Sequence, residues 1–132
     1  MVPETIIDMQ KFLLTTATLF GALSVMIGAF GAHALQQMLE MYQRTDTFET
    51  AVKYQFYHTL ALFMIGLLMF RVQDKLLGYA GLAMIAGIII FSGSLYILSL
   101  TNTKAWGAVT PFGGVFMITG WVLLVIVIIR SL

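Results

Sequence analysis

The stretch Leu76–Leu100, LLGYAGLAMIAGIIIFSGSLYILSL, decides the fold class of this chain. It contains no Asp, Glu, Lys or Arg. An α-helix of about 20 apolar residues is long enough to cross the hydrocarbon core of a bilayer. We therefore predict that these residues form a transmembrane helix.

The rest of the chain has the same character as this stretch. Of the 132 residues, 60% are apolar and only 10% are charged, and the mean hydropathy is +0.95. Soluble domains are roughly 45–50% apolar and about 25% charged, so this chain has too little polar surface for a soluble monomer. Disordered chains are poor in apolar residues, which excludes that class too. We predict an all-α integral membrane protein.

Three further apolar stretches flank the first, and together they predict a four-helix bundle that forms one domain over residues 1–132. The expected spans are 12–34, 54–70, 76–100 and 111–129. Between the first two spans, residues 35–46 place apolar side chains at positions i, i+3, i+4 and i+7. This pattern is typical of a short amphipathic helix, which we expect at the membrane surface.

Polar residues mark where two of the helices are expected to begin. Asp46 and Glu49 have the spacing of a capping box, and Glu49 has the spacing of an i,i+4 ion pair with Lys53. Thr110 is the expected N-cap of the last span, because Pro111 after it suits the first helical position.

The first span also has one feature of a signal peptide. Ala32-His33-Ala34 has the A-x-A form of a cleavage site. However, the apolar run before it is about 20 residues, which is longer than a typical signal-peptide core, and the segment preceding that run is acidic. We therefore expect a retained helix.

The basic residues predict the orientation of the spans. With four spans, both termini and the 71–75 turn lie on one side, together with Lys11, Arg71, Lys75 and Arg130. The other side carries Arg44, Lys53 and Lys104. Because the side richer in Lys and Arg usually faces the cytoplasm, we expect both termini there.

Several classes of function are excluded or disfavoured by residues that are missing. The chain has no Cys, which removes disulfides, thiolate metal sites and cysteine nucleophiles. Its net charge is +1 with no basic cluster, so nucleic acid is not an expected partner. None of the spans contains Asp, Glu, Lys or Arg, which counts against ion pumps, ion-coupled transporters and voltage sensors but not against a passive pore.

The two histidines are the main candidates for chemistry. His33 ends the first span, and His58 lies about one turn inside the second span from the same membrane face. An antiparallel pair of helices would bring them to similar depth, with Tyr54 and Gln55 beside His58. Such a pair could bind haem, a metal or a quinone. It could equally be a hydrogen-bonded pair that joins two helices, and both interpretations stay open.

Small residues recur at helical spacing and predict faces where helices pack closely. These positions are Gly21, Ser24, Gly28, Gly31, Ala80, Ala83, Gly87, Gly113 and Gly120. Ser92-Gly93-Ser94 lacks the acid and base partners of a nucleophilic serine. Trp121 is expected near the middle of the bilayer, where its indole N–H needs a partner such as Ser or Thr on another span.

Several segments, in their order and spacing, resemble one known family. They are Gly28–His33, Thr50–Gln55, Phe91–Tyr96, Thr110–Gly114 and Gly120-Trp121. The chain resembles domain-of-unknown-function family 423 over about residues 12–129. The resemblance implies a four-helix protein of the bacterial cytoplasmic membrane without an established activity, and it supplies no catalytic residue. It directs attention to a possible shared polar cluster of His33, Tyr54, Gln55, His58, Ser92, Ser94 and Tyr96.

The function we expect is therefore not enzymatic. The leading interpretation is a scaffold or accessory membrane protein that binds lipid or another membrane subunit, with a second copy of itself as a further partner. No resident cofactor is predicted in this interpretation. One alternative is a protein that binds haem, quinone or another small ligand through His33 and His58. A second alternative is a passive channel or small-solute transporter.

Overall fold

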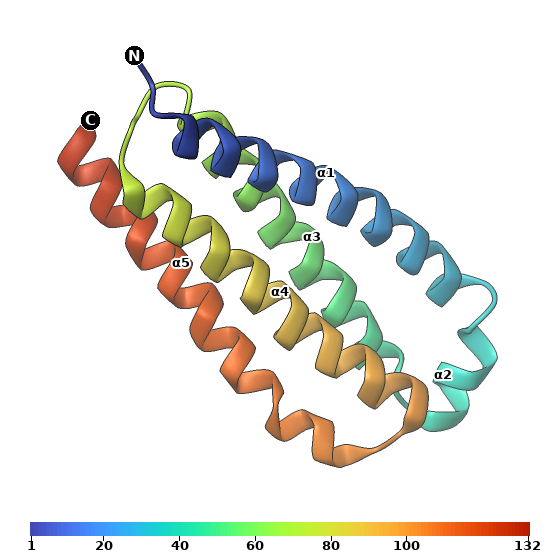
Figure 1. Cartoon of the computed structure of the whole chain (residues 1–132). Coiled ribbons are helices and arrows are strands. Elements are labelled where there is room, and N and C mark those ends of the chain that lie inside the picture. The colour runs from blue at the N-terminus through green and yellow to red at the C-terminus, as the bar shows by residue number, and fades with distance from the viewer.

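The computed structural model describes residues 1–132 and contains helices and turns but no strand (Figure 1). The elements are α1 (Glu4–Ala32), α2 (Gln36–Tyr42), α3 (Thr45–Leu68), α4 (Lys75–Thr101), the 3₁₀ helix η1 (Lys104–Ala108) and α5 (Thr110–Ser131). The four long helices run side by side. Both chain termini and the turn between α3 and α4 lie at one end, and α2 and η1 lie at the other (Figure 1).

Three segments are long and apolar enough to cross a membrane: α1, α4, and η1 together with α5 over Lys104–Ser131. The predicted all-α class is therefore confirmed, and three of the four predicted spans correspond to segments that could cross a membrane. Helix α3 does not meet the same criterion, because the polar residues Lys53, Gln55 and His58 lower its mean hydropathy. The prediction that α3 is a span rested on residues 54–70 alone, without the polar turns that precede them.

Helices α3 and α4 form the centre of the bundle, α1 packs against α3, and α5 packs against α4. The apolar core lies toward the end that carries the termini. Leu13 of α1, Leu62 of α3 and Met84 of α4 are all fully buried in it. This order leaves one side of α1 and one side of α5 uncovered by protein.

The ends of the helices differ from the predicted boundaries. Helix α1 begins at Glu4, well before the predicted span 12–34, because the polar turns ahead of the apolar stretch are helical as well. The predicted surface helix 35–46 shortens to Gln36–Tyr42, because Gln43 adopts a left-handed conformation with φ of 55°. That residue stops α2 and redirects the chain into α3.

The two predicted N-caps are wrong by one or two residues. Arg44 is the N-cap of α3, so Asp46 lies inside its first turn and caps nothing with its side chain. The cause is the early turn at Gln43, which lets α3 begin sooner. Val109 is the N-cap of α5, and the Thr110 hydroxyl bonds to the Trp106 carbonyl at 3.4 Å instead.

Glycines allow the long helices to approach closely. A Cβ atom added at Gly113 of α5 would lie 2.3 Å from the backbone nitrogen of Phe91 in α4. A Cβ at Gly87 would lie 2.6 Å from the Met117 side chain, and one at Gly120 would lie 3.0 Å from Met84. Helices α4 and α5 can therefore be this close only because these positions lack side chains.

The other predicted packing residues lie at helix contacts to different degrees. Gly21, Gly28 and Gly31 face the side chains of Thr59, Val52 and Phe48 on α3. Ser24 and Ala80 are buried, whereas Ala83 is half-buried. The small-residue pattern did not predict two further close contacts. The Leu14 side chain lies against Gly66, and the Leu13 side chain lies against Gly81.

Candidate functional site

The contacts between α1 and α3 establish where the two histidines lie. Gly28 is opposite Val52 and Gly21 is opposite Thr59, so the two helices are antiparallel with a constant register. In this register His58 is level with the middle of α1. His33 lies about eleven residues further along, which is about 16 Å at the rise of an α-helix.

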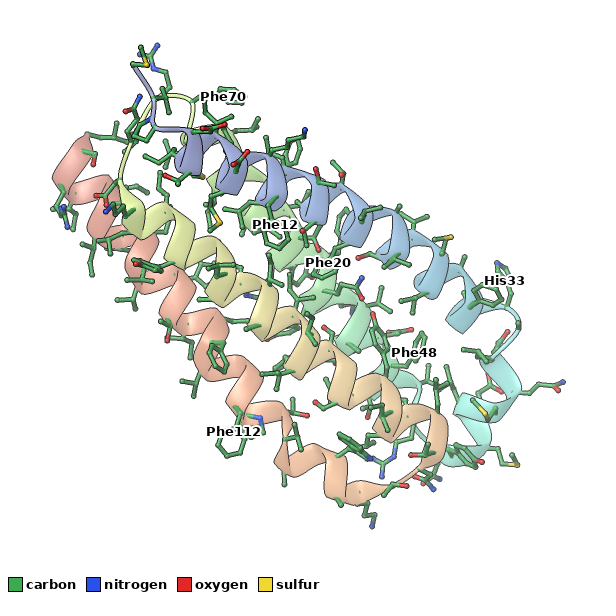
Figure 2. All side chains as sticks on the ribbon, in the orientation of Figure 1. Phe12, Phe20, His33, Phe48, Phe70 and Phe112 are labelled. Carbon is green, nitrogen blue, oxygen red and sulfur yellow. The ribbon has the colours of Figure 1, made fainter.

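The prediction that the histidines share one depth is therefore wrong. Its physical cause is that α3 begins at Thr45 with turns of polar character, which carry His58 well into the helix. His33 caps the end of α1 and is exposed, and Figure 2 shows it at the outer corner where α1 meets α2. The structure does not bring the two imidazole rings together.

Both ring nitrogens of His58 have partners inside the protein. The indole N–H of Trp121 in α5 donates to Nε2 at 3.1 Å, and Nδ1 lies 2.8 Å from the Tyr54 carbonyl oxygen. An indole N–H can only donate, so Nε2 accepts and the proton is inferred to lie on Nδ1. A metal or haem iron at Nε2 would have to displace Trp121. The partner of Trp121 is thus a histidine and not the expected Ser or Thr.

Aromatic rings surround this pair. Tyr54 stacks on Phe91 of α4 with 4.7 Å between ring centroids, and on His58 with 5.9 Å. The Trp121 ring meets His58 edge-on at 6.0 Å. These contacts leave His58 only 7% exposed. The ring is therefore held in one orientation by three helices.

Gln55 is the second polar centre, and it connects α3 to two other helices. Its Nε2 donates to the Phe20 carbonyl of α1 at 3.1 Å. Its Oε1 accepts a hydrogen bond from the Tyr96 hydroxyl of α4. Gln55 is 96% covered, so water cannot take the place of either hydrogen bond. The Gln55 amide therefore joins α3 to both α1 and α4.

The two serines of α4 are also engaged. Ser92 donates to the Ala51 carbonyl of α3 at 2.7 Å. Ser94 lies 2.7 Å from the Thr110 hydroxyl of α5. Of the seven residues proposed as one cluster, the structure therefore brings six to the α3–α4–α5 side of the bundle and leaves His33 outside. Protein groups satisfy the polar side-chain atoms of five of the six, and Tyr54 contributes its ring and its backbone carbonyl.

The main cavities of the molecule lie away from these side chains. None of the five main cavities is lined by Gln55, His58, Ser92 or Tyr96. No three His, Asp or Glu side chains gather where they could hold one metal ion. The arrangement has the character of an internal polar brace that joins helices.

A hollow with a different chemistry lies at the opposite end from the termini. It has a volume of about 430 Å³ and lies between the end of α1, α2 and the start of α3. We call it the α1–α3 groove. Its floor is apolar or lacks side chains, and its rim is charged. The floor includes Gly28, Gly31, Leu39, Phe48 and Val52, and the charged residues are Glu40, Glu49 and Lys53.

The groove follows from two local features of the chain. Gly31 leaves space beside α1 for the Phe48 ring, since a Cβ there would lie 2.3 Å from a ring carbon. Figure 2 shows Phe48 inside the bundle toward the α2 end. The left-handed residue Gln43 then folds α2 back over this end and brings Glu40 to face α3.

The charges of the groove are largely free of protein partners. The predicted Glu49–Lys53 ion pair is wrong, because the only ion pair in the chain joins Arg130 to Asp74. The charged groups of Glu49 and Lys53 lie more than 4 Å apart. Glu40 accepts one hydrogen bond from Gln36 at 3.1 Å. The sequence pattern assigned Glu49 and Lys53 only to the first turns of a helix, and their closeness to Gly28 and Gly31 in space reveals the groove.

Comparisons with known proteins agree on one family. Residues 27–114 match the family model described as "Protein of unknown function (DUF423)". The chain is 40% identical over 128 residues to the UPF0382 membrane protein YwdK of Bacillus subtilis (strain 168), covering 93% of this chain and 100% of YwdK. It is 43% identical over 116 residues to a UPF0382 membrane protein of Staphylococcus epidermidis (strain ATCC 12228 / FDA PCI 1200), covering 85% and 93%.

A relative from Escherichia coli shows the same pattern. The chain is 35% identical over 121 residues to the UPF0382 inner membrane protein YgdD of Escherichia coli (strain K12), covering 92% of each protein. No solved structure matches the chain. The similarity therefore extends over nearly the full length of these relatives, all of which are named as membrane proteins.

Proposed function

The chain belongs to the family described as a protein of unknown function (DUF423), and we propose that it is a four-span membrane protein that acts without catalysing a reaction. Helix α3 is the fourth span in this proposal. Its polar residues Gln55, His58 and Thr59 are buried against other helices, whereas Phe63 and Met64 on its outer side are exposed. An apolar outer face, together with a buried polar face that is paired with protein at Gln55 and His58, suits a helix with lipid on one side.

The same proposal places the protein in a bacterial cytoplasmic membrane with both termini in the cytoplasm. Lys11, Arg71, Lys75 and Arg130 all belong to the end that carries the termini. The opposite end has one basic residue fewer. This bias supports the orientation through the positive-inside rule.

The role that the geometry supports best is that of an accessory protein that holds a lipid in the α1–α3 groove. One contrast carries this proposal. The buried polar side chains between helices are paired with protein, apart from the Thr59 hydroxyl. Glu49 and Lys53 in the groove, by contrast, have no protein partner. A hollow with an apolar floor and free charges at its rim suits an amphiphile.

The other two interpretations receive less support. Ligand binding at the histidines requires a free ring nitrogen, and both nitrogens of His58 are occupied. A passive pore requires a continuous polar path, whereas Gln55 and Ser92 direct their polar atoms at backbone carbonyls or Tyr96 within the bundle. Neither interpretation is needed to explain the polar residues.

Lipid retention tests the proposal. Protein extracted gently in detergent is analysed by native mass spectrometry for phospholipid of any headgroup. Ala32 lines the groove and is exposed, so Ala32→Trp should fill its mouth without disturbing the core. Ala29 is exposed on another surface of α1, beside His33, so Ala29→Trp is the matched control.

We expect the wild-type chain and Ala29→Trp to keep a bound phospholipid and Ala32→Trp to lose it. A wild-type chain that retains no phospholipid, or an equal loss in both tryptophan variants, would contradict the proposed role.

A further inference from the structure

We propose that the α1–α3 groove selects a phospholipid whose headgroup carries both a phosphate and a primary ammonium. This inference rests on the proposed function and names the class of lipid. It goes beyond general contact with the bilayer, because it assigns separate parts of the lipid to separate residues.

The groove lies at the depth where a lipid changes from polar to apolar. Glu49 and Lys53 lie one turn apart on α3, with Lys53 deeper in the helix by about 6 Å. After Lys53, the rest of α3 contains no Asp, Glu, Lys or Arg. Lys53 is therefore the last charge before the apolar part of the bundle, and a long Lys side chain can reach back to the membrane surface from there.

A second hollow continues the groove toward the membrane interior. It has a volume of about 250 Å³ and is lined by Ser24, Val25, Phe56 and Tyr57, and it shares Val52 and Lys53 with the groove. Lys53 thus lies at the junction of a charged hollow and an almost wholly apolar one. A molecule that fills both must have a polar end and an apolar chain, which a water-soluble solute lacks.

The charges select the type of polar end. Glu40 and Glu49 are acceptors only, and a primary ammonium offers three N–H donors to them. Hydrogen bonds between two ionised groups are shorter and stronger than neutral ones. Lys53, at the junction, is correctly placed for the phosphate that joins the headgroup to the acyl chains. The ammonium then points outward to the carboxylates, as the covalent order of such a lipid requires.

The same charges act against lipids that lack the ammonium. The three ionised groups of the groove sum to one negative charge, so a phosphate without a positive group would meet net repulsion. The volume of about 430 Å³ lies within the roughly 300–1,000 Å³ typical of small-molecule sites. The groove is thus large enough for the headgroup and carries charges complementary to it.

A competition experiment tests this assignment. The full chain in detergent is titrated with equimolar phosphatidylethanolamine and phosphatidylglycerol that have the same acyl chains, and bound lipid is counted by native mass spectrometry. The variant is Glu49→Gln, which removes the charge and keeps the size. The matched control is Asp46→Asn, because Asp46 is exposed on the same helix, one turn earlier, and does not line the groove.

We expect wild type and Asp46→Asn to prefer phosphatidylethanolamine by roughly fivefold, the size of one well-formed interfacial ion pair, and Glu49→Gln to lose most of this preference. Lys53→Met should weaken the binding of both lipids, since both carry the phosphate, whereas Lys104→Met, outside the groove, should weaken neither.

The outcomes separate this inference from the function on which it rests. Equal binding of the two lipids by wild type, or the same loss in Asp46→Asn as in Glu49→Gln, would overturn the headgroup assignment while lipid retention in the groove still stands. Absence of any bound phospholipid would overturn both.

Discussion

Trp121 of α5 donates its indole N–H to Nε2 of His58 in α3, with 3.1 Å between the two nitrogens. Helices α3 and α5 pack mainly on opposite sides of α4, so this hydrogen bond reaches past the helix between them. Both residues lie near the middle of their helices. In the four-span arrangement that position lies inside the hydrocarbon region, where water does not replace a lost partner.

Replacement of Trp121 by Phe should therefore destabilise the bundle. The change leaves Nε2 of His58 without a donor, and polar pairs between membrane helices are worth about 0.6 kcal/mol on average and about 1.7 kcal/mol at most. We expect a loss of about 1–2 kcal/mol once the smaller ring is included, measured by unfolding in a detergent titration. Trp106→Phe, in η1, is the control and should cost less than about 0.5 kcal/mol.

A double-mutant cycle isolates the hydrogen bond from the packing. If the bond is real, Trp121→Phe and His58→Phe together should cost less than the sum of the two single changes, by roughly 0.5–1.5 kcal/mol. Strict additivity would show that the two side chains stabilise the bundle independently.

Gly113→Ala should weaken the contact between α4 and α5. The new methyl group would lie 2.3 Å from the Phe91 backbone nitrogen, and backbone cannot give way as a side chain can. Overpacking of this kind costs about 1–3 kcal/mol. Thermal unfolding in detergent measures the loss.

Gly93 provides a sharp control for that substitution, because a Cβ there meets nothing within 4 Å. Gly93→Ala should be neutral or stabilising by up to about 1 kcal/mol, since alanine is the better helix former. If the two glycine variants behaved alike, helix propensity and not close packing would govern both positions.

Asp74 should matter more as a helix cap than as an ion-pair partner. Its Oδ1 accepts from the Leu76 N–H at 2.9 Å, and the loss of such a cap costs about 1 kcal/mol. Its other oxygen lies 3.4 Å from Arg130, whose side chain is 60% exposed, and exposed pairs are worth about 0–1 kcal/mol. In unfolding titrations, Asp74→Ala should thus destabilise clearly more than Arg130→Gln, and the reverse order would contradict the capping role.

The helical class of this protein could be predicted from residue types alone, because a bilayer forces an apolar stretch such as 76–100 to satisfy its backbone within one helix. The glycines at 87, 113 and 120 were predictable as packing positions for a similar reason. Each of these positions has no side chain and lies at helical spacing from another small residue. Both properties can be read from the sequence without knowing which helix packs against them.

The candidate site was less predictable because it depends on how helices are matched along their length. The depth of His58 relative to His33 follows from where α3 begins, and the left-handed residue Gln43 sets that point. The partners of Gln55 come from α1 and α4, which no local spacing reveals. The groove likewise exists only once α2 folds back beside Gly31.

The proposed four spans can be tested by cysteine labelling, for which the chain is well suited because it contains no cysteine. Ser131→Cys at the end of α5 and Thr103→Cys, between α4 and η1, are both exposed and lie at opposite ends of the bundle. In intact bacteria a membrane-impermeant maleimide should label Thr103→Cys and not Ser131→Cys, and in inverted vesicles the pattern should reverse. Gln37→Cys in α2 and Gln73→Cys in the turn after α3 are both exposed and flank α3. If α3 crosses the membrane, Gln37→Cys should behave like Thr103→Cys, and Gln73→Cys should behave like Ser131→Cys. Labelling of Gln37→Cys and Gln73→Cys from the same side would instead show that α3 does not span the bilayer, and the four-span proposal would then be wrong.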